Sequence, residues 1–288
     1  MTPSEFKRYF PRRKPESHKG NFGKVFILAG SRGFSGAPYL VSVGALRAGA
    51  GLITLAVPKS LYQVMALKLI EVMTKPLPET RQGSFSLKAE REIKGFLKSQ
   101  DVLALGPGLG QNPETQALTR HVALSCDKPL VIDADGLNAF LGNPDLLKRL
   151  RSPAILTPHP GEAGRLFDCG VPKDDTGRKR FASQVARQYG VVLVLKGHHT
   201  VIAAPNGKVG MNLTGNPGLA TGGSGDLLTG IIAAFLGQGL DPFSAARCGV
   251  FIHGFAADLA VKEFGEISLT PMDVLQYLPK AFKVILRY

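Results

Sequence analysis

The sequence predicts an α/β fold in which a mostly parallel sheet is covered by helices on both faces. Short, continuously apolar runs alternate with stretches of helical periodicity through the first two thirds of the chain, and the last third is helical in pattern. A strand that is apolar on both sides is buried on both faces, which is typical of a parallel sheet packed between helices. We therefore expect a three-layer sandwich.

Six apolar runs are expected to form strands. In chain order they are KVFILAG, LITLAVP, DVLALGPG, PLVIDADG, PAILTPH and VVLVLKG. Helical periodicity lies between them, for example at residues 60–70 and 86–98. Every run except LITLAVP ends in Gly, Asp or His. Because ligands of parallel α/β sheets lie beyond the carboxyl ends of the strands, we look for the chemistry at those endings.

A hairpin and three helices are predicted to complete the chain. The segment HTVIAAPNGKVGMNL contains an Asn206–Gly207 pair that favours a tight β-turn. Helices are expected from Gly225 to about Leu236, over Phe243–Phe264 and after Leu269. The last has a clear start, with Thr270 as the N-cap, proline in the first helical position and an aspartate in the first turn.

Length and composition predict one globular domain. The 288 residues are 44% hydrophobic, and we expect a single domain over residues 23–288 after a basic extension of residues 1–22. The three cysteines, Cys126, Cys169 and Cys248, are far apart, which disfavours a disulfide framework or zinc site. No apolar run approaches the ~20 residues of a membrane span, and the N-terminus lacks a secretory signal core. A cytoplasmic protein without membrane contact is expected.

The chain is strongly basic, with a formal net charge of +13 from 35 Lys+Arg and 22 Asp+Glu. Such an excess favours polyanionic partners, either nucleic acid or a nucleotide bound near a basic surface. The chain has no Trp and no alternation of basic and aromatic residues. We therefore do not expect nucleic acid as a partner.

The strongest chemical signal is the glycine-rich segment NLTGNPGLATGGSGDLLTGIIAAFLGQG, residues 212–239. It passes directly into an apolar helix whose first turn contains Asp226. Glycines let the backbone approach an anion, and the free N–H groups of a helix start point at it. An acid in a first turn is also an ordinary helix cap, but a cap needs no G-G-S-G before it. We interpret the loop as a phosphate cradle and Asp226 as a catalytic base.

Two further strand ends supply candidate site residues. Lys196 closes the run VVLVLKG, where it either contacts nucleotide phosphates or reaches solvent. His198 and His199 follow it, and neighbours on an extended chain would point to opposite faces, which disfavours a metal site. In AILTPHPGEAGRL, His159 and Glu162 follow the strand and are either site residues or an ordinary loop histidine and first-turn acid.

Three weaker strand-end loops together suggest a crevice for an extended ligand. They are Gly30–Ala37, Gly106–Gly110 and Asp133–Gly136. Asp133 and Asp135 are candidates to lie near a magnesium ion, which nucleoside phosphates normally bring with them.

Six segments, in this order and spacing, resemble the ADP/ATP-dependent NAD(P)H-hydrate dehydratases of the ribokinase-like superfamily. They are SGAPYLVSVGALRAGAGLITLAVP, GPGLG, VIDADGLNAF, LTPHPGE, LKG and GNPGLATGGSGDLLTGI, within about Gly23–Ala260. The resemblance implies a ribokinase-like fold and a reaction on hydrated NADH or NADPH. ADP or ATP, with Mg²⁺, phosphorylates the hydroxyl of the reduced nicotinamide ring; phosphate then leaves and NAD(P)H is regenerated. Phosphate is a much better leaving group than hydroxide.

The same resemblance implies roles for individual residues. Those matching positions that hold the hydrated dinucleotide are Ala37, Gly108, His159 and Asp226. Those matching positions around the adenine nucleotide are Lys196, Gly197, His198, His199, Thr200 and Gly225. Glu162 matches an acid associated with magnesium and phosphates; its motif reads H-P-G-E, where sugar and vitamin kinases have Asn in place of His159.

Partners are also implied by the resemblance. Many relatives carry an N-terminal epimerase domain, so we expect a separate epimerase, and a homo-oligomer, a tetramer by analogy. The alternative activity is that of a ribokinase-like kinase of a small vitamin-precursor alcohol, whose base would occupy the same position. H-P-G-E and GNPGLATGG favour the dehydratase. The preferences for ADP or ATP and for NADH or NADPH hydrate stay open.

Overall fold

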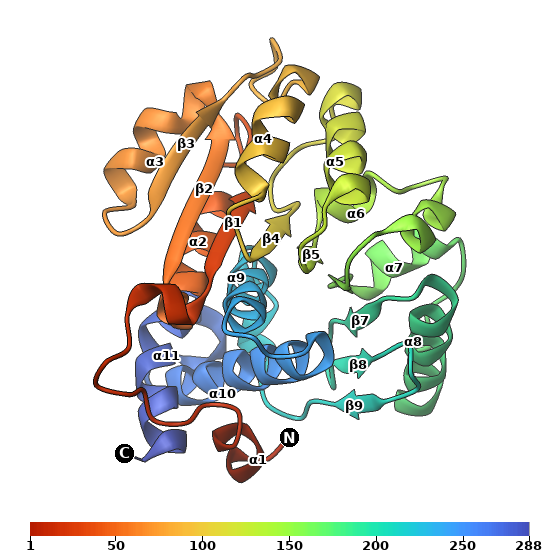
Figure 1. Cartoon of the computed structure of the whole chain (residues 1–288). Helices are drawn as coiled ribbons and strands as arrows, with labels where there is room; N and C mark the ends of the chain where they lie inside the picture. The colour runs from red at the N-terminus through yellow and green to blue at the C-terminus, as the bar shows by residue number, and fades with distance from the viewer. Residues whose placement is uncertain (288) are drawn as a thin grey trace.

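A nine-stranded sheet organises the chain in the computed structural model, which describes residues 1–287 (Figure 1). The strand order is β3-β2-β1-β4-β5-β6-β7-β8-β9. Pairing is parallel from β3 through β7, and β8 and β9 join antiparallel. The strands are β1 Lys24–Leu28, β2 Leu52–Pro58, β3 Met73–Leu77, β4 Val102–Leu105, β5 Leu130–Ile132, β6 Ala154–Leu156, β7 Val192–Leu195, β8 Val201–Ala203 and β9 Val209–Met211.

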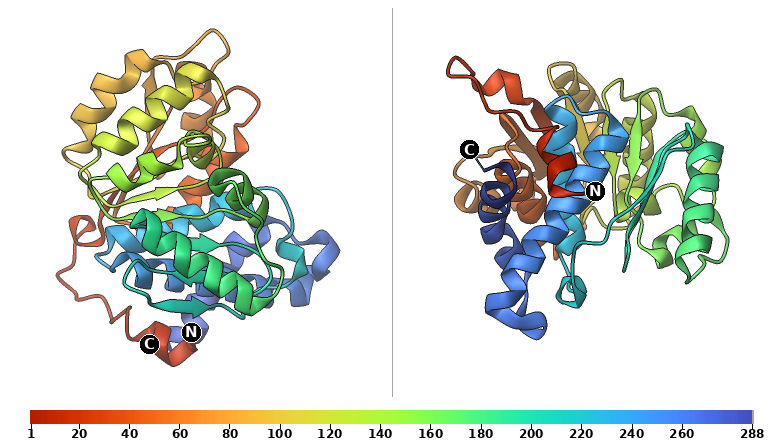
Figure 2. Two further views of the ribbon diagram at one scale, coloured as in Figure 1. Left: turned by 90° about the vertical axis from the view of Figure 1, so that its right-hand side faces the viewer. Right: turned by 90° about the horizontal axis from the view of Figure 1, so that it is seen from below.

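Helices cover both faces of this sheet, as the two views of Figure 2 show. They are α1 Pro3–Lys7, α2 Gly36–Arg47, α3 Tyr62–Lys68, α4 Glu90–Leu97, α5 Pro113–Ser125, α6 Asp135–Asn138, α7 Pro160–Phe167, α8 Asp175–Tyr189, α9 Ser224–Gly237, α10 Pro242–Ser268 and α11 Pro271–Leu286. One apolar layer contains side chains of α2, α9, α10 and α11, and the other contains those of α4, α5, α7 and α8. The predicted three-layer architecture is confirmed.

Strand β1 shows why the apolar runs are continuous. Val25 and Ile27 belong to the layer with α9, whereas Phe26 and Leu28 belong to the layer with α5. Successive strand side chains point to opposite faces, and here both faces are packed. All six predicted strands are confirmed, as β1, β2 and β4 to β7. The hairpin is confirmed as β8 and β9.

Strand β3 was not predicted. Its sequence MTKPL contains a lysine and a proline, and only Leu77 at its end is buried. It lies at the edge of the sheet, pairing with β2 alone. Edge strands commonly carry such residues, which hide the apolar signal on which the prediction relied.

The helical last third agrees with the prediction, with longer bounds. Helix α9 spans Ser224–Gly237, and α10 runs on to Ser268 with a kink at Gly265, whose φ is 69°. Helix α11 begins as expected, because Thr270 and Asp273 form a reciprocal capping box around a proline at the helix start.

The N-terminal segment, which we predicted only as a basic extension, packs on the fold. Phe6 of α1 is fully buried and stacks on Phe10, with ring centroids 4.6 Å apart. Its ring also lies 6.2 Å from Phe235 and 6.0 Å from Phe282, so α1 packs against α11 and the core beneath it (Figure 1). Burial of Phe6 thus docks an otherwise polar segment. A single domain over residues 23–288 stays a prediction.

Across residues 1–287 no helix is both long enough and apolar enough to cross a membrane. Cys126 and Cys248 are buried and Cys169 is exposed, all as free thiols. A cytoplasmic location stays a prediction.

Candidate functional site

A cavity of about 810 Å³ lies where the carboxyl ends of β6 and β7 meet the start of α9. Its other walls are the loop 212–221 and the middle of α10, including Val250 and His253. All six residues predicted to surround the adenine nucleotide line this cavity, together with His159: they are Lys196, Gly197, His198, His199, Thr200 and Gly225. The chain therefore brings the predicted nucleotide half of the site together around one space.

The start of α9 has the form expected of an anion site. Gly223, the N-cap, has φ 92° and makes no side-chain cap, and a Cβ there would lie 2.4 Å from the Leu40 side chain. The backbone N–H groups of Gly225 and Asp226 have no acceptor among residues 1–287. Free N–H groups and the helix dipole favour negative charge at this point. The arrangement supports the predicted phosphate cradle.

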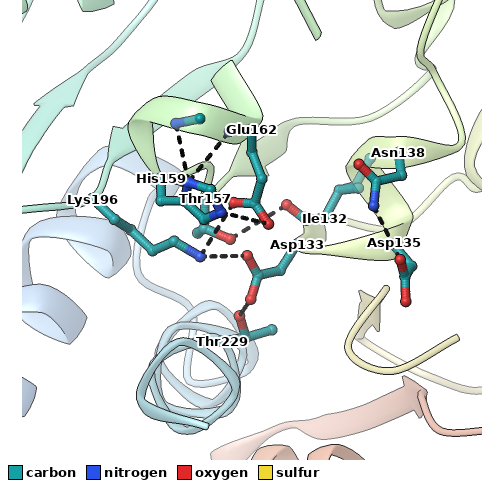
Figure 3. A network of polar contacts seen from close by, with 10 residues as sticks. Ile132, Asp133, Asp135, Asn138, Thr157, His159, Glu162, Lys196 and Thr229 are labelled. Atoms are coloured by element: carbon teal, nitrogen blue, oxygen red, sulfur yellow. Dashed lines mark hydrogen bonds and ion pairs between the residues drawn. The ribbon is translucent and has the colours of Figure 1, made fainter. Parts of the chain in front are cut away.

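A network of polar contacts lies directly beside this helix start (Figure 3). Asp133, at 1% exposure, accepts hydrogen bonds from Lys196 Nζ at 2.9 Å and from Thr229 Oγ1 at 2.8 Å. The same Lys196 Nζ lies 3.7 Å from Glu162 Oε2. A Cβ at Gly225 would lie 3.2 Å from this ammonium. Lys196 is thus held between two carboxylates and the glycine loop, and it does not simply reach solvent.

The charge on Lys196 is secured by these neighbours. Burial lowers the pKa of Lys196, but the charges of Asp133 and Glu162 and the hydrogen bond to Asp133 outweigh burial, so its pKa is raised overall. The side chain therefore remains an ammonium at neutral pH and keeps its attraction for an anion in the cavity.

Asp226 has the opposite shift. Burial first, and then the charge of Asp133, raises its pKa from 3.8 to about 7, although the ammonium of Lys196 acts to lower it. A carboxylate that titrates near neutrality can accept a proton in its ionised form and release it later. This is the property that the predicted catalytic base requires.

His159 and Glu162 combine structural and site positions. His159 Nδ1 accepts from the N–H groups of Gly161 at 3.0 Å and Glu162 at 3.3 Å, and Glu162 Oε2 accepts from the His159 N–H at 2.8 Å (Figure 3). This capping box starts α7. The His159 side chain is nevertheless half exposed at the cavity, and Glu162 lies beside Lys196. The capping role of this pair is confirmed, and its role in the site stays a prediction.

Ala37 and Gly108, from the predicted dinucleotide half, lie next to each other but do not line the cavity. Gly108 follows β4 with φ 65°, and a Cβ there would lie 3.0 Å from both Ala37 Cβ and Phe34 Cβ. Phe34 is 56% exposed. Two loops after β1 and β4 thus meet, which is consistent with a second part of an extended site.

Our expectation for His198 and His199 was wrong. Their rings are stacked, with centroids 3.8 Å apart and planes 29° apart. The backbone is not extended here, because Gly197 has φ 132° and His199 has φ 55°. The pair forms part of one cavity wall instead of pointing to opposite faces.

Two polar residues of the site were missed by the sequence analysis. Thr229 of α9 and Asp258 of α10 each stand between apolar or glycine residues on both sides. Thr229 donates to Asp133, and Asp258 accepts from the Gly215 N–H at 2.9 Å and so holds the cavity loop. A polar residue flanked in this way within a helix is the signal that could have found both. The two carboxylate oxygens of Asp133 accept from Lys196 and Thr229, and its expected place near magnesium stays a prediction.

Comparison with known proteins identifies the family. A family model described as NAD(P)H-hydrate dehydratase matches residues 25–280. This chain belongs to the NAD(P)H-hydrate dehydratase family. Among dehydratase relatives, the bifunctional NAD(P)H-hydrate repair enzyme Nnr of Moorella thermoacetica is 44% identical over 279 residues, covering 97% of this chain and 53% of the relative. The corresponding enzyme of Escherichia coli is 37% identical over 268 residues, covering 93% and 49%. The chain spans about half the length of these curated relatives.

Solved structures agree with this family and its fold. An ADP/ATP-dependent NAD(P)H-hydrate dehydratase from Bacillus subtilis, co-crystallised with ATP and Mg²⁺, superposes with a TM-score of 0.83 at 32% identity and covers 99% of this chain and 97% of that one. A ribokinase-like superfamily protein from Enterococcus faecalis has a TM-score of 0.82 at 26% identity, covering 100% and 96%. The predicted ribokinase-like fold is confirmed.

Proposed function

We propose that this chain is an ADP- or ATP-dependent dehydratase of hydrated NADH and NADPH. The observation that carries the proposal is Asp226, a partly buried carboxyl with a pKa of about 7 at a helix start whose N–H groups have no acceptor among residues 1–287. The helix start receives the transferring phosphoryl group, and Asp226 takes the proton of the substrate hydroxyl as that group arrives. Phosphate then leaves the ring, and the reduced nicotinamide is restored.

The cavity and the neighbouring loops support a division of labour. The turn Lys196–Thr200 and Gly225 line a space of about 810 Å³, which is ample for an adenine nucleotide. Lys196 neutralises phosphate charge at its inner end. The hydrated dinucleotide would then lie toward Ala37 and Gly108, with His159 and Asp226 between the two ligands. These residue roles are proposals, drawn from the family motif and from this placement.

The negative charge of the site suits Mg²⁺, but the described side chains do not form a complete set of metal ligands. Among residues 1–287, no group of three or more His, Cys, Asp or Glu side chains is arranged to hold a metal ion. Four carboxylates, of Asp133, Asp135, Glu162 and Asp226, share the region with the single ammonium of Lys196. Mg²⁺ that arrives with nucleotide phosphates would offset this negative charge, and Glu162 is the side chain we propose beside it. Bound there, the ion would neutralise charge on the phosphates.

One assay tests this function and separates it from the kinase alternative. Purified protein is incubated with Mg²⁺, hydrated NADH and either ADP or ATP, while the near-ultraviolet absorbance of NADH is followed. A dehydratase restores the absorbance in proportion to the phosphate released. A kinase of another alcohol consumes no hydrated NADH, and absence of recovery with both nucleotides would refute the proposal. The hydroxyethylthiazole kinase of Pyrococcus horikoshii shares the fold alone, at 14% identity and a TM-score of 0.65.

The same assay decides the nucleotide preference, and a parallel run with hydrated NADPH decides the dinucleotide preference. A separate epimerase and a homo-oligomer stay predictions. An assay on a mixture of the two epimers of hydrated NADH tests the need for an epimerase. A dehydratase that acts on one epimer leaves the other unconverted until an epimerase is added.

A further inference from the structure

The turn that carries Lys196 is held from behind by Arg178, a residue of α8 that does not line the cavity. Its guanidinium is buried, with 6% of the residue exposed. Nη2 donates to the carbonyls of Leu195 at 3.1 Å and Lys196 at 3.2 Å, and Nη1 donates to the carbonyl of His198. One planar side chain thus fixes three carbonyls in four consecutive residues, which a flexible point charge could not do.

Gly197 fits the turn against this guanidinium. Its φ of 132° is one that side-chain-bearing residues rarely adopt. A Cβ there would lie 3.2 Å from Arg178 Nη2. The glycine therefore lets the turn close directly onto the guanidinium, which gives Gly197 a structural reason in addition to its place at the cavity.

Arg178 makes no ion pair with a carboxylate within 4.0 Å, in the part of the chain that the structure describes. Burial lowers its pKa, and the more distant charge of Asp175 acts in the opposite direction. A buried cation without a carboxylate partner lowers the stability of a fold unless dipoles compensate it. Here the compensation comes from the three carbonyls of the turn, so Arg178 and the turn depend on each other.

The orientation of these carbonyls leaves the opposite side of the turn rich in donors. The backbone N–H groups of Gly197, His198 and His199 have no acceptor among residues 1–287, and all three residues line the cavity. Consecutive N–H groups in a turn with positive φ form a concave site for anions. The same turn has a second tie to α8, because His199 Nδ1 lies 2.8 Å from Asp175 Oδ2.

We propose that Arg178 is a positioning residue for adenine-nucleotide binding. It holds the turn so that Lys196, the free N–H groups and the stacked His198–His199 pair face the nucleotide in a preformed arrangement. Arg178 touches neither ligand and acts through the turn. The identity of the nucleotide rests on the proposed function. Without Arg178 the turn must be ordered when the nucleotide binds, which weakens binding of that ligand selectively.

Two substitutions and one matched control test this role. Arg178→Met removes the charge and all three hydrogen bonds but keeps the length of the side chain. Arg178→Lys keeps the charge without the planar fork. Arg180→Met alters an exposed arginine of the same helix. Calorimetric titration with ATP·Mg²⁺ and ADP·Mg²⁺ in the absence of dinucleotide measures nucleotide Kd, and steady-state assays measure the KM for hydrated NADH and kcat.

We expect the nucleotide Kd to rise at least tenfold in Arg178→Met, to rise by an intermediate factor in Arg178→Lys, and to stay unchanged in Arg180→Met. The KM for hydrated NADH at saturating nucleotide should change less than twofold. An unchanged nucleotide Kd in folded Arg178→Met, or an equal loss for both ligands, would overturn the proposal, because either result indicates a purely structural residue.

Two other outcomes, a variant that does not fold and a wild type without dehydratase activity, can each be told apart from failure of this proposal. If Arg178→Met is not recovered as folded protein, Arg178→Lys decides by the same comparison of Kd and KM. Wild-type protein that binds nucleotide but restores no NADH would refute the dehydratase activity. The Arg178 comparison would still be decided by nucleotide Kd alone.

Discussion

Replacing Asp226 by asparagine is expected to abolish turnover. The same substitution is expected to raise the free energy of unfolding above that of the wild type, by an amount that grows as the pH rises. Asparagine keeps the size of the side chain but can neither ionise nor accept the substrate proton. Loss of a positioned general base lowers kcat by about 10²–10⁴-fold. In the wild type, kcat/KM should rise with pH toward a plateau above about 7, where Asp226 is ionised.

The effect on stability follows from the pKa of Asp226 in the two states. In the unfolded chain the carboxyl has its ordinary pKa of 3.8, and in the fold its pKa is about 7. Below 3.8 both states are protonated and the shift costs nothing. As pH rises from 3.8 toward 7, the unfolded state releases its proton first, so wild-type stability falls; above 7 the penalty stays constant. The penalty is roughly 2 kcal/mol at pH 5 and roughly 4 kcal/mol at pH 8, at about 1.4 kcal/mol per pKa unit.

Urea unfolding of both proteins at pH 5 and pH 8 measures this penalty directly. The advantage of Asp226→Asn over wild type should grow by about 2 to 3 kcal/mol between the two pH values. Asp145→Asn is the control, because Asp145 is a carboxylate with 77% side-chain exposure and should show neither effect. A stability difference that is flat from pH 5 to 8 would refute the raised pKa. A variant that retains more than about a tenth of wild-type kcat would refute the role of base.

Four other changes give three separate tests. Lys196→Ala should raise the nucleotide KM at least tenfold with little change in the KM for hydrated NADH. It should also destabilise the protein by about 3 kcal/mol, because Asp133 loses its cation. A rise confined to the dinucleotide KM would mean that the two halves of the site are reversed. Phe6→Ala should lower the free energy of unfolding, measured with urea, by about 3 kcal/mol, and deletion of residues 1–19 should lower it at least as much. An unchanged free energy of unfolding in either variant would show that α1 does not dock in solution. Burial lowers the pKa of His253 from 6.5 to about 4. As the pH falls from 6.5 to 4, the unfolded chain therefore binds a proton at this histidine before the folded protein does, and the free energy of unfolding of the wild type decreases. Wild type should lose about 3 kcal/mol more than His253→Gln over that range, and equal losses would contradict the shift.

The strands and helices near the site followed from local patterns. Six buried strands, the Asn206–Gly207 hairpin and the capped start of α11 were predicted, because each depends on apolar periodicity or turn chemistry within a few residues. The glycine-rich loop before Asp226 was predicted from local sequence in the same way. Its free N–H groups follow from the backbone of the helix start, whichever elements pack around it.

Segments whose stability comes from distant partners were not predictable in this way. Strand β3 pairs only at an edge, and its lysine and proline removed the apolar pattern. The N-terminal segment reads as polar and basic, yet Phe6 finds its partners on α9, α10 and α11. Burial of one Phe side chain stabilises a fold by about 1.5–3 kcal/mol, but the burial of Phe6 depends on surfaces more than 200 residues away.

The sequence by itself predicted which residues are candidates for the site, and the tertiary structure decided which of them contact one another. Lys196 stands 63 residues after Asp133 in the chain, and the two meet because β5 and β7 flank β6 in the sheet. That contact raises the pKa of Lys196. The charge of Asp133 also raises the pKa of Asp226, whereas Lys196 acts to lower it. Residue type and spacing are local properties, whereas a pKa and a hydrogen-bond partner are properties of the space in which burial and neighbouring charges meet.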